Sequence, residues 1–173
     1  YRIEQQLSLG GFSIVYLATD PQGRVVAIKE YLPNSLALRG AGEIKPVISE
    51  DHLPAFRYGM KCFFEEGRAL AKLSHPNVIR VLNFFRANDT VYMVMEYEMG
   101  RTLQEFIQKN RPVITENFIR NVFTKLLNGL REVHSHKLLH LDLKPSNIYM
   151  RNDYSPVLID FGAARQTLAS DSP

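Results

Sequence analysis

The sequence predicts an α+β fold with two lobes, a small one built on an antiparallel β-sheet with one long helix and a larger helical one. Short apolar runs rich in β-branched residues alternate with Gly and Pro turns in the first 30 residues, and apolar residues recur at helical spacing in two later segments. The 173 residues are enough to bury a core that needs no disulfide or structural metal.

Charge and composition exclude several classes of protein. The chain has 21 Lys and Arg against 18 Asp and Glu, and its net charge of +3 is spread without basic runs, so nucleic-acid binding is not expected. The longest apolar stretches fall far short of the roughly 18 residues that a membrane span needs, so no membrane contact is expected within this segment. The single cysteine, Cys62, cannot close an internal disulfide, which favours a reducing compartment.

Three antiparallel strands are expected in the first 30 residues. The apolar runs Ile14–Tyr16 and Val25–Ile28 are separated from their neighbours by Gly10 and Gly11 and by the segment Asp20–Gly23. Pro and Gly in that last segment preset the backbone angles of a tight turn.

Residues 31–53 form a long connection with several Pro and Gly residues, interpreted as padding of the small lobe, with docking of a partner as the alternative. A helix should follow, capped by Asp51 with Pro54 in its first turn and ended by His75-Pro76-Asn77. Its apolar face comprises Phe56, Met60, Phe63, Phe64, Gly67, Leu70 and Leu73. Cys62 on this helix is expected to be a small core residue, and two more strands are expected around 78–86 and 90–97.

The chain turns helical after Gly100. Thr102 and Glu105 have the spacing of a capping box, and Thr115 precedes a second helix. The apolar face of that helix comprises Phe118, Ile119, Val122, Leu126, Leu130 and Val133. We expect the two helices to lie against each other, and short strands around 138–140, 147–150 and 157–159 to flank loops with polar residues.

Four motifs stand at the ends of these elements: Ser8–Val15 between the first two strands, Val26–Lys29 in the third, His140–Asn147 after the long helix, and Asp160–Gly162 after the last strand. In this order they resemble a eukaryotic-like Ser/Thr protein kinase domain, and the resemblance covers essentially the whole chain. The phrases Leu-Ile-Asp-Phe-Gly-Ala-Ala-Arg, Tyr-Met-Val-Met-Glu-Tyr and Glu-Tyr-Leu-Pro are similar to bacterial members.

The resemblance implies the bilobal protein-kinase-like fold, with the small lobe at 1–98, the hinge at 96–100 and the start of the large lobe at 101–173. The chain stops 13 residues after Asp160 without an Ala-Pro-Glu motif, so the helical large lobe is expected to be incomplete, as in a piece truncated in the activation segment. Residues 1–173 alone are expected to show negligible phosphotransfer.

In the small lobe, the resemblance assigns Lys29 to the α- and β-phosphates of ATP and pairs it with Glu66, whose spacing to His75 favours it over Glu65. The adenine site would be formed by Val15, Ala27 and Tyr149 in the pocket, Met95 as gatekeeper, and the backbones of Glu96 and Glu98 at the hinge.

In the phosphate-binding loop, Gly10 and Gly11 would let the backbone approach the phosphates, since a Cβ would obstruct them. Ser8 and Ser13 stand where the family pattern has its first and third glycines. The two substitutions predict weaker gripping of the phosphates, with ATP still bound.

In the large lobe, Asp142 would orient the substrate hydroxyl and accept its proton, and Lys144 would meet the γ-phosphate. Lysine at this place is typical of Ser/Thr kinases. Asp160 would chelate Mg²⁺ at the phosphates, and Asn147 would hold a second metal together with Asp160, both through hard oxygen ligands. Leu141 replaces an arginine that normally pairs with a phosphorylated activation loop, which predicts that loop phosphorylation is not needed.

The leading interpretation is therefore an ATP- and Mg²⁺-dependent signalling kinase that acts on Ser/Thr hydroxyls of protein substrates. A pseudokinase or scaffold is the alternative, followed by a kinase-fold enzyme acting on a small molecule. The protein is expected in the cytoplasm, as a free protein or as the cytosolic domain of a larger, membrane-anchored one. Thr167, Ser170 and Ser172 are candidate autophosphorylation sites.

Overall fold

The structure is a computed structural model that describes residues 1–161, 165 and 166. Its elements are mixed α+β, as predicted. The chain divides into two compact units, the first comprising Tyr1–Ala71 and Val81–Tyr97, the second comprising Lys72–Arg80 and the chain from Glu98 onward. Residues 72–80 thus belong to the second unit, although the sequence placed all of 1–98 in the first lobe.

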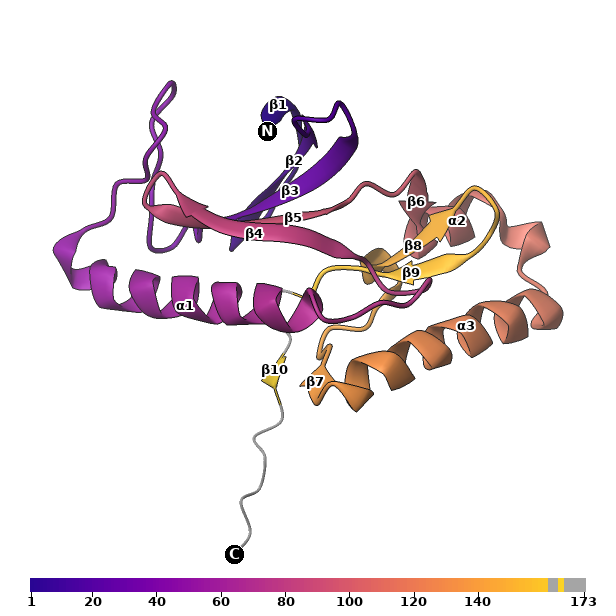
Figure 1. The fold of residues 1–173 in the computed structure, drawn as a ribbon. Coiled ribbons are helices and arrows are strands. Elements are labelled where there is room, and N and C mark those ends of the chain that lie inside the picture. The colour runs from indigo at the N-terminus through magenta and orange to yellow at the C-terminus, as the bar shows by residue number, and fades with distance from the viewer. Residues whose placement is uncertain (162–164, 167–173) are drawn as a thin grey trace, which may run out of the picture. The chain divides into compact units, whose positions relative to one another are not determined.

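The first unit is built on a five-stranded sheet in which every neighbouring pair is antiparallel (Figure 1). The strand order is β1-β2-β3-β5-β4. The strands are β1 (Arg2–Leu9), β2 (Ser13–Thr19), β3 (Val25–Tyr31), β4 (Val81–Ala87) and β5 (Thr90–Glu96). Because β3 is the central strand, hydrogen bonds to both of its neighbours fix its register.

The predicted turn between β2 and β3 is confirmed. Gly23 has a φ of 80° and its N–H donates to the Asp20 carbonyl at 2.9 Å. The Asp20 carboxylate accepts from the backbone N–H groups of Gln22 and Arg24 at 2.9 and 2.8 Å. A side chain therefore satisfies the donors that this turn leaves open.

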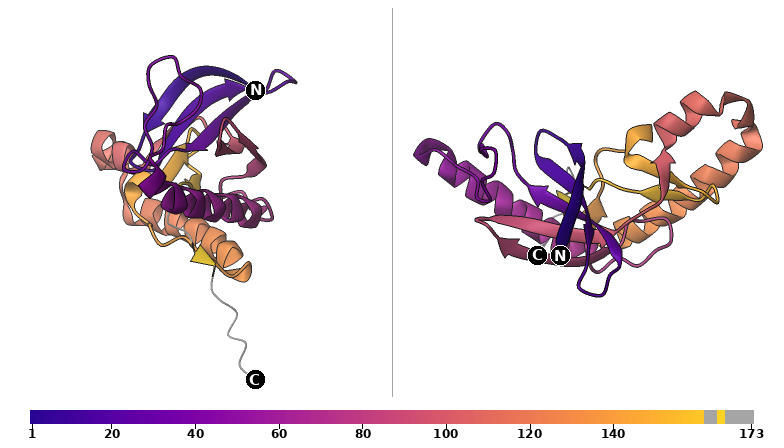
Figure 2. Two further views of the ribbon diagram at one scale, coloured as in Figure 1. Left: turned by 90° about the vertical axis from the view of Figure 1, so that its left-hand side faces the viewer. Right: turned by 90° about the horizontal axis from the view of Figure 1, so that it is seen from above.

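Helix α1 (Leu53–Leu70) runs along one face of the sheet, after a 3₁₀ turn at Glu50–His52 (Figure 2). Pro54 lies in its first turn as predicted, but the prediction that Asp51 caps the helix is wrong. Asp51 lies within the 3₁₀ turn, and the capping position falls on His52, whose side chain makes no capping bond. The helix also ends before Leu73, since the apolar spacing continues into a turn that the sequence could not separate from it.

Aromatic side chains fasten α1 to the sheet. The ring of Tyr31 on β3 lies 5.2 Å from that of Phe56 and 5.8 Å from that of Phe63, measured between centroids. Phe64 meets Phe84 of β4 edge to face at 4.9 Å. Cys62 is exposed on this helix, so its prediction as a core residue is wrong: it lies outside the stripe that faces the sheet.

The opposite face of the sheet carries its own small core. Its buried members are Ala18, Val26, Ile28 and Val94, with Phe85 and Tyr92 packed against them. Neither face of β3 is therefore open to water, and this is why the strand reads as a nearly continuous apolar run.

The second unit combines two helices with short strands. Its elements are β6 (Gly100–Thr102), α2 (Leu103–Lys109), a 3₁₀ turn (Arg111–Val113), α3 (Glu116–Ser135), β7 (Leu138–Leu139), a 3₁₀ turn (Pro145–Asn147), β8 (Ile148–Arg151), β9 (Pro156–Leu158) and β10 (Arg165–Gln166). The strands form a sheet of order β6-β8-β9 and a β7–β10 pair. Among the described residues, no helix has both the length and the apolar character needed to cross a membrane.

Both α-helices of this unit begin at the capping residues that the sequence predicts. Thr102 and Glu105 form the predicted capping box, with the Thr102 N–H donating to the Glu105 carboxylate at 2.9 Å. The Thr115 hydroxyl accepts from the Phe118 N–H at 3.2 Å. The two helices meet through stacked rings of Phe106 and Phe118, 5.3 Å apart. Ile119, predicted on the buried face of α3, is instead exposed.

Residues 72–80 join the second unit through β9. The Asn77 amide donates to the Pro156 carbonyl at 2.8 Å, and its backbone carbonyl accepts from the Leu158 N–H at 2.8 Å. The Ile79 N–H in turn donates to the Leu158 carbonyl at 2.9 Å. These bonds use the backbone of residues 77 and 79 within the second unit, and β4 starts at Val81, three residues later than predicted.

Replacing Gly100 with alanine should destabilise the protein more than the same change at Gly42. An added Cβ at Gly100 would overlap the Met150 carbonyl oxygen inside the β6–β8 pair, whereas at Gly42 it would meet no atom within 4 Å. Gly42 has a φ of 82°, so its cost is that of the left-handed backbone alone, roughly 1–2 kcal/mol. We expect Gly100→Ala to lower the free energy of unfolding by about 3 kcal/mol in urea denaturation, and equal losses at the two positions would contradict this packing.

Candidate functional site

Lys29 is a buried cation on the face of the sheet that α1 covers. Only 8% of the residue is exposed, and its Nζ lies 6.0 Å from the centroid of the Phe63 ring on α1. Directly opposite residues in antiparallel strands share a face, so Lys29 stands in a row with Val15 of β2 and Met93 of β5. The strand register therefore brings a lysine into a largely apolar setting against one helix.

The same register groups three residues predicted for the adenine pocket. Ala27 lies two residues before Lys29 on β3, and Met95 is directly opposite Ala27. Val15, Ala27 and Met95 therefore share the face of Lys29. Glu96 ends β5 at the boundary of the first unit.

The two neighbouring glutamates on α1 differ in environment. Glu66 is half-buried, whereas Glu65 is exposed and lies 3.6 Å from Arg68 on the helix surface. An ion pair between Lys29 and Glu66 stays a prediction.

The loop between β1 and β2 is short. Ser8 is paired with Val15 and Ser13 begins β2, so only Gly10, Gly11 and Phe12 lie between the strands. The Gly10 N–H donates to the Ser13 carbonyl at 2.9 Å, and an added Cβ at Gly10 would lie 3.3 Å from that oxygen. At Gly11 an added Cβ would meet nothing within 4 Å.

In the second unit, the loop before β8 gathers three predicted residues. The Asn147 amide donates to the Asp142 carboxylate oxygen Oδ2 at 2.8 Å and to its backbone carbonyl at 2.9 Å. Lys144 Nζ lies 3.2 Å from the same Oδ2. Asn147 is 5% exposed, while Asp142 and Lys144 reach solvent. The buried amide thus fixes the backbone and the side chain of Asp142 together.

His140 ties this loop to the end of β9. It is 2% exposed, its Nδ1 accepts from the Asp142 N–H at 3.2 Å, and its Nε2 lies 2.8 Å from the Ile159 carbonyl. A carbonyl can only accept, so the proton of the neutral ring is on Nε2. The ring of Phe161 lies 4.5 Å away. Through these contacts, the buried His140 side chain links the loop to residues 159–161.

Asp160 and Asn147 offer oxygen ligands from neighbouring segments. The Ile159 N–H donates to the Asn147 carbonyl at 3.1 Å, and Asp160 follows with an exposed side chain. Mg²⁺ takes one or two such protein ligands and completes its shell with water and phosphate oxygens, so this donor set fits it. Gly162, Thr167, Ser170 and Ser172 lie outside the described residues.

Glu98 and Tyr149 are held within the second unit. Arg151 donates to both Glu98 carboxylate oxygens, at 2.7 and 2.6 Å, and to the Pro76 carbonyl at 2.7 Å. The Tyr149 hydroxyl donates to the Gly100 carbonyl at 3.0 Å. Sequence reasoning missed Arg151, because nothing in its local pattern separates it from an ordinary surface arginine.

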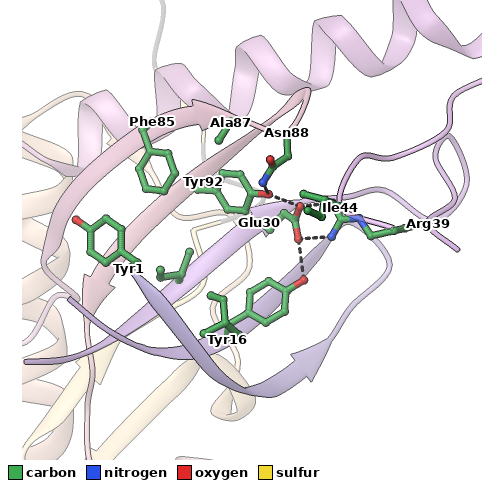
Figure 3. A pocket seen from close by; sticks show the side chains of 11 residues that line it. Tyr1, Tyr16, Glu30, Arg39, Ile44, Phe85, Ala87, Asn88 and Tyr92 are labelled. Carbon is green, nitrogen blue, oxygen red and sulfur yellow. Dashed lines mark hydrogen bonds and ion pairs between the residues drawn. The ribbon is translucent and has the colours of Figure 1, made fainter. Parts of the chain in front are cut away.

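A second buried cluster, centred on Glu30, was also missed (Figure 3). Glu30 is 1% exposed and accepts from the Tyr16 and Tyr92 hydroxyls at 2.7 and 2.9 Å. Both terminal nitrogens of Arg39 donate to its two carboxylate oxygens. Burial, followed by the bond to Glu30, raises the pKa of Tyr16 well above its usual value. The sequence signal that could have revealed this cluster was Glu30 itself, a glutamate that follows Lys29 in an otherwise apolar strand.

This cluster lies on the face of the sheet opposite to Lys29. Glu30 is directly opposite Tyr92 on β5 and adjacent in sequence to Lys29, so the two side chains leave β3 in opposite directions. It borders a cavity of about 390 Å³, lined further by Tyr1, Ile44 and Phe85. The predicted site residues do not include any part of this cluster.

The sequence pattern of the protein kinase domain matches residues 1–172. The chain is 31% identical to serine/threonine-protein kinase B of Synechocystis over 95% of its own length, and 32% identical to serine/threonine-protein kinase PknA of Nostoc over 98%. It covers 27% and 28% of those two proteins, so it spans about a quarter of such curated relatives.

A solved structure described as "PpkA-294 apo form" resembles the chain in three dimensions. The TM-score is 0.85 at 36% sequence identity, over 92% of this chain and 57% of the other. The predicted protein-kinase-like fold is thereby confirmed.

The raised pKa of Tyr16 predicts a loss of stability in alkaline solution. An unfolded tyrosine loses its proton near pH 10, whereas folded Tyr16 keeps it, so the stabilisation is complete below about pH 10 and is lost as the pH rises above it. We expect the free energy of unfolding to fall between about pH 10 and 12, and Tyr16→Phe to make the fall shallower while costing about 1–3 kcal/mol at neutral pH. Chemical denaturation at a series of pH values measures both, and an equally steep fall in the variant would disprove the assignment.

Proposed function

The chain belongs to the protein kinase family, and from this premise we propose that the protein transfers the γ-phosphoryl group of ATP to serine or threonine hydroxyls of other proteins. The relatives named above are serine/threonine-protein kinases, which supports this choice of acceptor. Phosphoryl transfer depends on positioning and electrostatics more than on covalent help from the protein, so held polar side chains are what it requires.

The observation that carries the proposal is the cluster of Asp142, Lys144 and Asn147. Both side-chain contacts to the Asp142 carboxylate go to Oδ2, at 2.8 Å from Asn147 and 3.2 Å from Lys144. The proposal assigns the other oxygen, Oδ1, to orienting the substrate hydroxyl and accepting its proton. Lys144, half-exposed beside it, would meet the γ-phosphate and stabilise the charge that develops there.

In the first unit, the proposal assigns phosphate neutralisation to Lys29 and its support to Glu66. A lysine buried between strands and a helix is held in one place, which supports a positioning role for its ammonium group. Val15, Ala27 and Met95 on the same face would receive the adenine ring, with Tyr149 completing the pocket and the backbones of Glu96 and Glu98 reading its edge. Gly10, Gly11 and Ser13 would cover the phosphates.

Asn147 and Asp160 would hold Mg²⁺, which supplies charge neutralisation at the phosphates when bound. Their oxygens are hard ligands, and Asn147 is kept in place by its bonds to Asp142.

The exposed, unpaired thiol of Cys62 suits a reducing interior, where ATP is also found, so we place the protein's activity in the cytoplasm. Leu141 at the place of an arginine supports activity without phosphorylation of the activation segment.

Asp142→Asn should abolish transfer while sparing nucleotide binding. The amide keeps the shape of the side chain but cannot accept the hydroxyl proton, so we expect transfer of labelled phosphate by the complete protein to fall by about 10²–10⁴-fold. Binding of ATP, followed by thermal stabilisation, should change little. Asp51→Asn removes an exposed carboxylate from the 3₁₀ turn and should leave both readouts unchanged. Wild-type protein that binds ATP without any transfer would overturn the proposal in favour of a binding-only role.

Gly11→Ala should separate contact with the nucleotide from stability of the fold. The added methyl group meets no protein atom within 4 Å, so we expect an unchanged melting temperature and a KM for ATP raised about tenfold by the obstructed phosphate. Gly10→Ala, crowded against the Ser13 carbonyl, should lower the melting temperature as well. An unchanged KM in Gly11→Ala would remove this loop from the phosphate site.

A further inference from the structure

The connection that follows β3 is bonded to the tip of the Gly10–Gly11 loop. The Leu32 N–H donates to the Phe12 carbonyl at 3.0 Å, and the Asn34 N–H donates to the Gly11 carbonyl at 3.0 Å. These two bonds continue the β2–β3 pairing beyond its last partners, Ser13 and Tyr31. The loop tip is therefore tethered to residues that the sequence interprets as padding.

The tethering residues are themselves held in a compact turn. The Pro33 carbonyl accepts from the N–H groups of Leu36 and Ala37, at 3.0 and 2.9 Å. Leu32 and Ala37 are buried. Residue 38 then pairs with residue 47 through two backbone bonds of 3.0 and 2.7 Å. The start of the connection is thus an ordered structure.

The Arg39 side chain bonds this part of the connection to β3 of the sheet. Its guanidinium binds the buried carboxylate of Glu30 through two nitrogens, nine residues along the chain from Glu30 (Figure 3). Glu30 and Arg39 side chains are 1% and 18% exposed, so this pair is shielded from salt and water. The other ion pair of the connection, Lys45 with Asp89, is 69% and 65% exposed and contributes much less.

We propose that residues 32–39 form a strap that holds the phosphate-binding loop, with the Arg39–Glu30 pair as its latch and Arg39 as a positioning residue. The proposal rests on the function proposed above, in which this loop grips the phosphates of ATP. A trans peptide directs its C=O and N–H to opposite sides, so holding the Gly11 and Phe12 carbonyls fixes the N–H groups of the same two peptides on the side away from the strap. The strap thereby preorganises loop donors for an anion.

The first test removes one tether without touching the latch. Asn34 is the second residue of the turn that Pro33 begins, a place where proline is well tolerated, and Asn34→Pro deletes the N–H that binds Gly11. We expect the KM for ATP to rise about tenfold, while the KM for the protein substrate stays the same. Asn34→Ala keeps the N–H and is the matched control, with both constants expected at their wild-type values.

The second test opens the latch. The double variant Glu30→Gln/Arg39→Met removes both charges together, so no unpaired charge is left buried. Amide hydrogen exchange of Leu32 and Asn34 should accelerate at least about tenfold, whereas exchange in the middle of β3 should not change. Lys45→Met removes the exposed ion pair of the same connection and should leave these amides at the wild-type rate.

These readouts separate the strap from the function of the protein. Unchanged exchange at Leu32 and Asn34 in the double variant, or equal ATP KM values in Asn34→Pro and Asn34→Ala, would overturn the strap. If the wild-type complete protein binds no nucleotide, the proposed function fails, and the exchange rates still decide whether the latch holds these amides.

Discussion

The alternation of side chains along β3 is the constraint on which the first unit depends. Lys29 and Glu30 are neighbours in sequence and therefore leave the central strand on opposite faces, one toward α1 and the other toward Tyr16 and Tyr92. A slip of one residue in register would exchange them, placing each charge among groups that cannot stabilise it. The hydrogen-bonded Glu30 cluster thus specifies the orientation of Lys29, although it lies on the other side of the sheet.

In the second unit, too, buried polar side chains fix the orientation of a neighbouring residue. His140 and Asn147 are 2% and 5% exposed, and each uses its polar atoms on the backbone of a neighbouring segment. Leu141 and Asp160 have φ values of 62° and 56°, a left-handed conformation that non-glycine residues adopt only at a cost. The bonds of His140 and Asn147 go to Asp142, which follows Leu141, and to Ile159, which precedes Asp160, so they offset that strain and hold Asp142 in one orientation.

Local rules were enough to predict much of the fold. The turn at Asp20–Gly23 and the capping box at Thr102 both depend on residues close in sequence. The resemblance of residues 140–147 to a kinase motif implied a common site for Asp142, Lys144 and Asn147, and the three side chains do meet.

Tertiary partners account for what the sequence could not supply. Asp51 has the chemistry of a cap, yet a 3₁₀ turn takes the chain past it before the helix begins. Arg39 and Arg151 bind carboxylates 9 and 53 residues away, and no local pattern distinguishes either from an exposed arginine. Residues 72–80 leave the first unit because Asn77 finds its partners on β9, which lies 79 residues later.

The proposed strap also bears on Ser8 and Ser13, the two serines beside the loop that we propose covers the phosphates. Glycine helps such a loop where the backbone must bend sharply or approach a ligand, but Ser8 and Ser13 lie in paired strands, where a side chain costs little. The chain passes from β1 to β2 through Gly10, Gly11 and Phe12, and the carbonyls of Gly11 and Phe12 are already bonded to Asn34 and Leu32. A loop ordered before the ligand arrives loses less conformational entropy on binding. A tethered loop has less need of the freedom that glycine gives, so the proposed strap would offset part of the weaker gripping that the two serines predict, and that weaker gripping stays a prediction.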